Sequence, residues 1–231
     1  MAACVRFELK GRHMKRLAAA VPISHNLQMT STMRNLTATI CLTLALLLGS
    51  AGVSFAQDWE KGVEAYQQGD FATAAQWFRK SAERGDAMAQ YSLGVMYDNG
   101  QGVPRDYKEA AQWYRKSAEQ GVSQAQYNLG GMYYSGQGVI QDYKEAVAWF
   151  RKSAEQGVAR AQFTLGLMYV TGQGVLQDNV YAHMWWNIAA LTGHADATKN
   201  RDIVAERMTA EDISKAQELA RECVRKNYKG C

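Results

Sequence analysis

The sequence predicts an all-α solenoid in which antiparallel helix pairs stack on one another. The first observation is a period of 36 residues that recurs along the 231-residue chain. The second is a helical spacing of apolar residues within each unit, and the third is a glycine at each expected helix end. Four registers share the period: Trp77, Trp113, Trp149 and Trp185; Asp70, Asp106, Asp142 and Asp178; Gly85, Gly121, Gly157 and Gly193; and Ala74, Ala110, Ala146 and Ala182.

The composition is that of a folded domain. Hydrophobic residues make up 47% of the chain, charged residues make up 21%, and there are only two prolines, which excludes wholesale disorder. The formal net charge is +4, but six basic residues and one acid precede residue 57. Residues 57–231 are therefore close to neutral, and we expect no nucleic-acid partner.

The segment that begins at Met33 has the three parts of a secretory signal peptide. Arg34 precedes an apolar run at 40–48, and a small-x-small site ends at Ala56. We predict cleavage between Ala56 and Gln57 and a periplasmic or secreted protein. The apolar run is shorter than the roughly 20 residues of a membrane-spanning helix, so no stable membrane anchor is expected after cleavage.

Two readings of the first 56 residues stay open. Residues 1–32 precede a self-sufficient signal, so either translation starts at Met33 or the leader 1–56 is unusually long. A lipoprotein site at Cys41 is disfavoured because Ile40, just before it, is bulky. The periplasmic destination assumes a bacterial source, since entry into the endoplasmic reticulum would give a similar pattern.

Each unit is expected to contain two helices, the first at 89–97, 125–133 and 161–169. The second begins after Asp106 or Asp142, each a predicted N-cap with a glutamate three residues later, as in a capping box. Gly121 and Gly157 then end the second helix in the left-handed conformation. One face of that helix is apolar, as in Ala110, Trp113, Tyr114, Ser117 and Ala118.

Two further glycine patterns repeat with the period. Gly94, Gly130 and Gly166 lie in mid-helix although glycine costs about 1 kcal/mol there relative to alanine, so we expect another backbone to pack very close. Gly-Gln-Gly-Val, which begins at residues 100, 136 and 172, is expected to be a structural turn. A phosphate-binding loop is the alternative, but the Lys-Ser/Thr that phosphate chemistry needs is missing.

The repeated motif resembles the Sel-one-like repeat (SLR) family, relatives of the tetratricopeptide repeats. It reads Ala-x-x-x-Leu-Gly-x-Met-Tyr, then Gly-x-Gly-Val, Asp, Ala-x-x-Trp and Ala-x-x-Gly over residues 87–193. Residues 57–86 resemble a tetratricopeptide repeat with a shorter loop, and residues 194–231 are expected to form C-terminal capping helices. The resemblance implies a right-handed superhelix that serves as a scaffold or adaptor for proteins or peptides.

The positions that differ between units predict the binding surface. They recur on one face of the first helices, which line the concave side of such a solenoid, and we expect them to form a groove for a protein or peptide. A merely solvated face is the alternative, and Tyr91, Tyr127 and Phe163 nearby are either core residues or aromatic anchors. The groove positions are Ser92, Val95, Asp98, Asn99, Asn128, Gly131, Tyr134, Ser135, Thr164, Leu167, Val170 and Thr171.

The two cysteines that remain after cleavage, Cys223 and Cys231, predict a short-loop disulfide in an oxidising compartment. Two thiolates with no histidine nearby supply half of a tetrahedral zinc site, so neither a metal nor another cofactor is expected. The pair Trp185-Trp186 is explained by core packing, because Trp185 continues the repeat and Trp186 replaces Phe78, Tyr114 and Phe150.

No enzyme is expected, although two alternatives to an adaptor remain. His183 and His194 are the only histidines after residue 56, and neither lies beside an evident nucleophile and acid. Some cysteine-rich relatives have been associated with β-lactam binding or hydrolysis, but their repeated cysteine pairs are absent here. The other alternative is self-assembly into a homo-oligomer.

Overall fold

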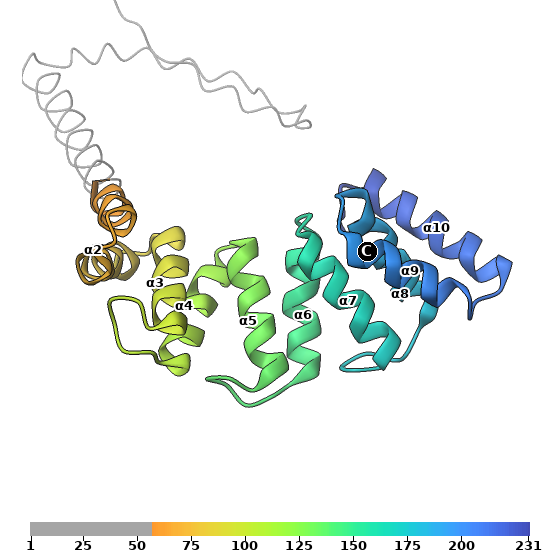
Figure 1. Cartoon of the computed structure of the whole chain (residues 1–231), viewed down its shortest axis with the longest axis horizontal. Helices are drawn as coiled ribbons and strands as arrows, with labels where there is room; N and C mark the ends of the chain where they lie inside the picture. The colour runs from red at the N-terminus through yellow and green to blue at the C-terminus, as the bar shows by residue number, and fades with distance from the viewer. Residues whose placement is uncertain (1–56) are drawn as a thin grey trace, which may run out of the picture. The chain divides into compact units, whose positions relative to one another are not determined.

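The computed structural model describes residues 57–231. Residues 57–67 are helical, and no strand occurs in the described part of the chain. Nine further helices follow this first segment (Figure 1): α2 Phe71–Glu83, α3 Ala87–Asn99, α4 Tyr107–Glu119, α5 Ser123–Ser135, α6 Tyr143–Ala154, α7 Ala159–Thr171, α8 Asn179–Leu191, α9 Ala195–Ala205 and α10 Ala210–Arg225. The predicted leader, its cleavage site and Cys41 lie outside the described residues.

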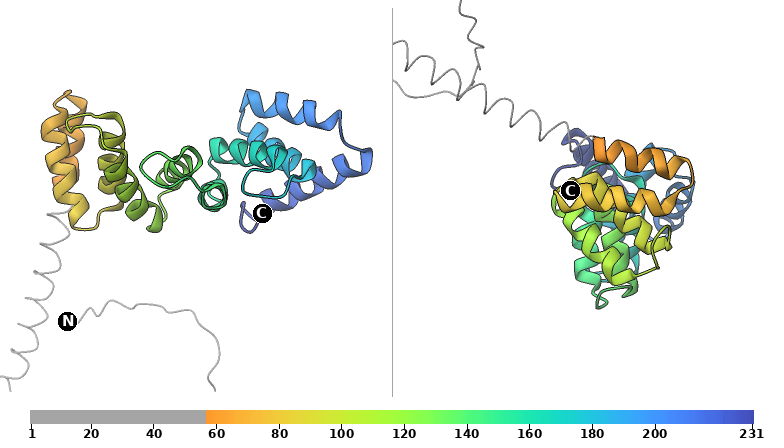
Figure 2. Two further views of the ribbon diagram at one scale, coloured as in Figure 1. Left: turned by 90° about the horizontal axis from the view of Figure 1, so that it is seen from below. Right: turned by 90° about the vertical axis from the view of Figure 1, so that its left-hand side faces the viewer.

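The helices pack in chain order, as a solenoid requires. From α2 to α9 each helix contacts the next one along the chain, and α10 turns back to pack against α8. Figure 2 shows the same succession from two further sides. The predicted all-α repeat solenoid is therefore confirmed for residues 57–231.

The residues that repeat in sequence form the core. The four alanines of the period, at 74, 110, 146 and 182, are all fully buried, and so are Leu93, Leu129 and Leu165. The small alanines let neighbouring helices approach, while the leucines fill the space between them. The apolar face predicted for the second helix, Ala110 to Ala118, is buried as expected.

The predicted N-caps are present, but the capping box is incomplete. The Asp106 carboxylate accepts hydrogen bonds from the backbone amides of Lys108 and Glu109, and Asp142 does the same one repeat later. The amide of Asp106 donates to the Tyr97 carbonyl at 3.0 Å, so the Glu109 side chain has no role in the cap. This bond joins the end of the first helix to the start of the second.

The mid-helix glycines correct one expectation, because an aromatic ring and not a backbone approaches them. A Cβ atom on Gly94 would lie 2.6 Å from the Tyr114 ring, and one on Gly130 would lie 2.8 Å from the Phe150 ring. The recurrence of glycine at this position in each repeat indicates that only a small residue fits. The ring that fills the space comes from the second helix of the same repeat.

A close backbone approach does occur, at the second glycine of each Gly-x-Gly turn. A Cβ on Gly102 or Gly138 would lie 2.0 Å from the carbonyl oxygen of Phe71 or Tyr107, the first residue of α2 or α4. Both glycines have positive φ, 69° and 71°, which other residues adopt at a cost. The turn therefore stacks each repeat on the preceding one, and its role is structural.

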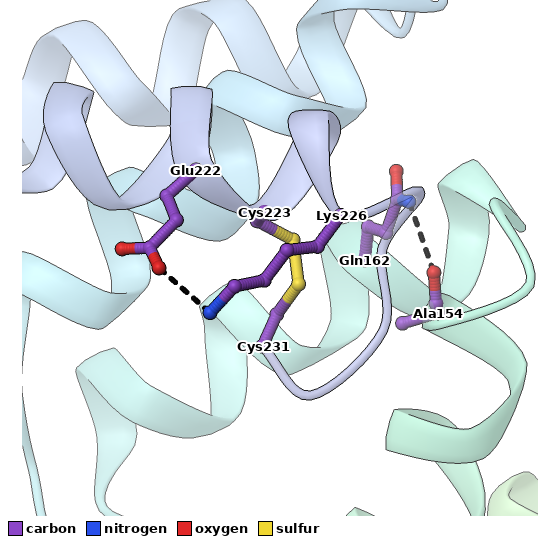
Figure 3. Close-up of a disulfide and its surroundings, with 6 residues drawn as sticks. All are labelled: Ala154, Gln162, Glu222, Cys223, Lys226 and Cys231. Carbon is purple, nitrogen blue, oxygen red and sulfur yellow. Dashed lines mark hydrogen bonds and ion pairs between the residues drawn. A yellow bond between two sulfur atoms is a disulfide. The ribbon is translucent and has the colours of Figure 1, made fainter.

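The tail after α10 folds back over the solenoid. The predicted disulfide between Cys223 and Cys231 is present, and Lys226 Nζ lies 2.6 Å from the Glu222 carboxylate. Figure 3 shows the disulfide that ties Cys231 to α10, and the Tyr228 ring of the tail would lie 3.5 Å from a Cβ on Gly157, between α6 and α7. No helix in the described part of the chain has both the length and the apolar character needed to cross a membrane.

Candidate functional site

All twelve predicted groove positions lie on the surface of α3, α5 and α7, and none is buried. Their neighbours in the same helices, including Leu93, Leu129 and Leu165, are fully buried. The contrast follows from helix geometry, because residues at offsets 0, 3, 6 and 7 share one face. The variable positions are thus less buried than the repeated ones, although Val95 and Val170 still pack against the core.

Several polar side chains on this face are already bonded within the chain. Asp98 accepts a hydrogen bond from the Tyr114 hydroxyl at 3.1 Å. Three hydroxyls donate to a carbonyl one turn earlier in their own helix: Ser135 to Gly131, Thr164 to Arg160 and Thr171 to Leu167. The exposed or half-buried apolar residues are left as the stronger candidates for partner contacts.

The face is divided into hollows, and one without a charged lining residue lies at the N-terminal end. This apolar hollow of about 300 Å³ is lined by the helical segment 57–67, by Phe78 of α2 and by α3. No charged residue lines it. Its walls are Trp59, Val63, Tyr66, Gln67, Phe78, Tyr91, Ser92 and Val95.

A second hollow of about 350 Å³ shares Tyr91 as a wall and is named here the Arg160 hollow. Three successive first helices contribute to it: Tyr91 from α3, Asn128 from α5 and Arg160 at the start of α7. Arg160 is exposed and is the only charged lining residue. The remaining walls are Gln124, Tyr127, Val158 and Ala159.

The other predicted positions are more scattered. Val170 lines a third hollow of about 330 Å³ together with Trp186, Ile203 and Arg207. The Tyr134 hydroxyl donates to Gln173 Oε1 at 3.0 Å, so this side chain supports the turn of the next repeat. The structure thus places the twelve residues on one face but distributes them among separate hollows.

The three aromatic residues near the face pack against the core, and their role as anchors for a partner stays a prediction. Each is half-buried and packs on a ring of the following helix: Tyr91 on Tyr114 at 6.0 Å, Tyr127 on Phe150 at 5.5 Å and Phe163 on Trp186 at 6.4 Å between centroids. Tyr91 and Tyr127 also line the Arg160 hollow. They are therefore core residues with one accessible edge.

The charge of Arg160 acts on the hydroxyl of Tyr91. Burial raises the pKa of Tyr91, while the positive charge of Arg160 and a hydrogen bond with Asn128 oppose the rise. These effects connect residues of α3, α5 and α7 across the hollow. Sequence reasoning missed Arg160, although the positions one and two repeats earlier, Gln124 and Met88, also differ from it.

The two histidines within residues 57–231 are both held by packing. His183 is 3% exposed, and burial and the nearby Arg201 lower its pKa. His194 precedes α9 and stacks on Phe163 at 4.6 Å. Within residues 57–231 no three His, Cys, Asp or Glu side chains are grouped as metal ligands.

Comparison with known families identifies the repeats. The profile of the Sel1 repeat matches residues 60–86, 87–122, 123–158 and 159–194. Together these matches cover more than half of the chain.

Two solved repeat structures and a short stretch of a curated protein are similar to this chain. A Sel1 repeat protein from Oxalobacter formigenes is 34% identical, with a TM-score of 0.61, over 72% of this chain and 69% of that one. A protective antigen with an SLR fold from uropathogenic Escherichia coli is 29% identical, with a TM-score of 0.53, over 75% of this chain and 47% of the antigen. DAP3-binding cell death enhancer 1 of Rattus norvegicus is 42% identical over 45 residues, which span 20% of this chain and only 9% of that protein.

Proposed function

Because the chain belongs to the Sel1 repeat family, whose members generally mediate protein–protein interactions, we propose that it is an exported, non-enzymatic adaptor. It binds a protein or peptide through the exposed face of α3, α5 and α7. Export rests on the signal-like segment 33–56, and cleavage before Gln57 would deliver residues 57–231 to the periplasm or the medium.

One observation carries the proposal: the three helices bury the residues that repeat and expose the residues that vary. Leu93, Leu129 and Leu165 are fully buried, whereas the aligned positions two residues on, Val95, Gly131 and Leu167, reach the surface. Stability alone does not require side chains to differ between repeats at an exposed position such as Leu167, which is 38% exposed. A row of hollows beside these positions, with half-buried aromatic walls, is the form that peptide-binding surfaces take.

Cross-linking mass spectrometry on the full chain in its own cells tests the proposal. Val95→Glu and Leu167→Glu each place a charge on the proposed face, and both should reduce cross-linking to the partner by about tenfold or more. Val224→Glu on α10 is the matched control, because Val224 is 37% exposed and lies off this face. Circular dichroism checks that each variant folds.

Two results would overturn parts of the proposal. Unchanged cross-linking in both Val95→Glu and Leu167→Glu would remove the face from the argument. A mature amino terminus at Met1, sequenced from the same sample, would overturn export. Light scattering at two concentrations separates an adaptor from self-assembly, because a homo-oligomer would gain mass with concentration.

A further inference from the structure

We propose that the apolar hollow and the Arg160 hollow together recognise an extended segment of a protein partner that carries a bulky apolar residue and, two positions away, an acidic residue. The apolar side chain enters the apolar hollow, and the carboxylate lies beside Arg160. This inference rests on the proposed adaptor function and specifies the chemistry of its partner.

The apolar hollow selects an uncharged side chain. Trp59, Val63, Phe78 and Val95 form much of its wall, and none of its lining residues carries a charge. Burying an aliphatic or aromatic side chain against such walls is favourable because it removes apolar surface from water. A charged group placed there would lose its hydration without gaining a partner.

The Arg160 hollow has the opposite preference, because it holds a positive charge that the chain itself does not neutralise. None of the ion pairs within residues 57–231 includes Arg160. No carboxylate lines the hollow. An arginine with free guanidinium donors favours a carboxylate with which it makes charge-assisted hydrogen bonds.

Comparison of the repeats shows that this positive region is specific to α7. Asp86 caps α3, where its carboxylate accepts from the Ala89 amide. One and two repeats later the same position is Val122 and Val158, neither of which supplies a side-chain cap. Only α7 combines the missing acidic cap with an arginine in the first turn, so its partial positive helix end adds to the charge of Arg160.

Tyr91 fixes how the two hollows are occupied together. It is a wall of both, so one ring separates the apolar side chain from the carboxylate. In an extended peptide, residues i and i+2 point to the same side and are about 7 Å apart. A residue pair with this spacing places one side chain on each side of the Tyr91 ring.

Fluorescence anisotropy with short peptides on the purified full chain tests the proposal. The probes are labelled pentapeptide amides with leucine and glutamate two positions apart, in both orders, on an alanine–glycine background. Matched probes carry glutamine or lysine in place of the glutamate, or alanine in place of the leucine. We expect the Leu/Glu probe to bind at least tenfold more tightly than the lysine or alanine probe.

Arg160→Glu should reverse the charge preference, so that the lysine probe binds better than the glutamate probe. Lys215→Glu on α10 is the matched control, since it makes the same change in net charge at an exposed position away from both hollows. It should leave the affinities unchanged. Val95→Trp fills the apolar hollow with a larger side chain. It should weaken the binding of the glutamate probe and of the lysine probe by the same factor.

The outcomes separate this inference from the adaptor proposal. Equal affinity for the three charge variants, an unchanged preference in Arg160→Glu, or no binding up to about 1 mM peptide would overturn the recognition chemistry. If the cellular partner still cross-links to the face, and Val95→Glu still reduces that cross-linking, the adaptor proposal stands without this inference. If the peptides do not bind and the cross-links to the face are also absent, both the recognition chemistry and the adaptor proposal are overturned.

Discussion

The regular repeats and the C-terminal end of the solenoid join their helices by different means. In the regular part, Gln120 Nε2 donates to Gln90 Oε1 at 2.7 Å, and Ser117 Oγ donates to the Ala87 carbonyl at 2.7 Å. One period later the same bonds recur, from Gln156 to Gln126 and from Ser153 to Ser123. At the C-terminal end the corresponding residues are Thr192 and Ala189, and the network stops.

The C-terminal end replaces these polar links with apolar packing. Trp186 fills the position of Tyr114 and Phe150 and is 3% exposed, and α10 covers α8 with Ala216, Ala220 and Cys223. The disulfide then holds the tail to α10. The difference shows that a repeated residue forms its hydrogen bond between repeats only where the next repeat supplies the partner. The last repeat is therefore covered by a helix that does not belong to the repeats.

The largest expected effect breaks the stacking of the regular repeats. Gly138→Ala adds a Cβ that would lie 2.0 Å from the Tyr107 carbonyl oxygen, at a residue with φ of 71°. The left-handed conformation and the forced shift together should lower the free energy of unfolding by about 2–4 kcal/mol. Urea denaturation measures the loss.

Gly121→Ala is the control for that substitution. Gly121 also has positive φ, at 93°, but a Cβ there meets nothing within 4 Å. It should cost only the conformational part, about 1 kcal/mol. Equal losses in the two variants would show that the close approach to Tyr107 contributes nothing to repeat stacking.

The second prediction breaks the cover of the C-terminal end. The double variant Cys223→Ser, Cys231→Ser opens a short loop and should cost about 2 kcal/mol. Because neighbouring helices contact mainly one another, hydrogen exchange should accelerate in α10 and α8 and stay unchanged in α3 and α4. A uniform acceleration through the chain would contradict the view that the two regions are held independently.

The sequence predicted what repeats, and it failed where one residue contacts another at a distance the period does not reveal. Asp106 and Asp142 were assigned as N-caps because a cap depends on local geometry alone. The ring that approaches Gly94 could not be identified from the sequence, because a glycine in mid-helix makes room equally well for a backbone or for a side chain. Tyr114 and Phe150 recur with the glycines, but periodicity does not say which repeated residues touch.

The candidate site shows the same division. Helix geometry alone predicted that the twelve groove positions, the first at Ser92 and the last at Thr171, reach the surface. The hollows could not be predicted in this way, because they depend on how three helices pack together. Arg160 reaches toward Tyr91, which lies two repeats earlier, and no local pattern encodes that approach. The packing of α10 on α8 likewise joins segments outside the period, so only the structure reveals it.

The third prediction uses His183, which replaces the apolar Ala111 and Val147 of the earlier repeats. Burial lowers its pKa in the folded state, so below about pH 6.5 the unfolded chain binds a proton that the folded chain does not. Stability is therefore lost as the pH falls below that value, by at most about 1.4 kcal/mol per pH unit. His183→Val should remove this slope and make the C-terminal end resemble the regular repeats.

Urea denaturation of both proteins between about pH 7.5 and 5.5 checks this prediction. Carboxylates such as Asp58, whose pKa is lowered by the hydrogen bond from Arg84, titrate in both proteins and cancel in the difference. Identical pH profiles would show that His183 is protonated equally in the folded and unfolded states.

The smallest effect restores the missing link. Gln162 of α7 donates through Nε2 to the Ala154 carbonyl at 3.1 Å, but its Oε1 is buried with no hydrogen-bond partner in the described part of the chain. Thr192→Gln places there the residue that Gln120 and Gln156 supply to the earlier repeats, and its amide should donate to Gln162 Oε1. The gain expected is about 0.5–1.5 kcal/mol, measured by urea denaturation.

Thr192→Glu is the matched control, because glutamate has the same length as glutamine and no amide donor. Both variants lose the Thr192 hydroxyl bond to the Ala189 carbonyl, so that loss cancels between them. A gain in Thr192→Gln alone would mean that the regular network ends at α7 only because one donor is missing. Equal effects in the two variants would mean that an amide at residue 192 does not reach Gln162 Oε1, and that the two ends of the solenoid differ by the packing of their helices and not by one missing donor.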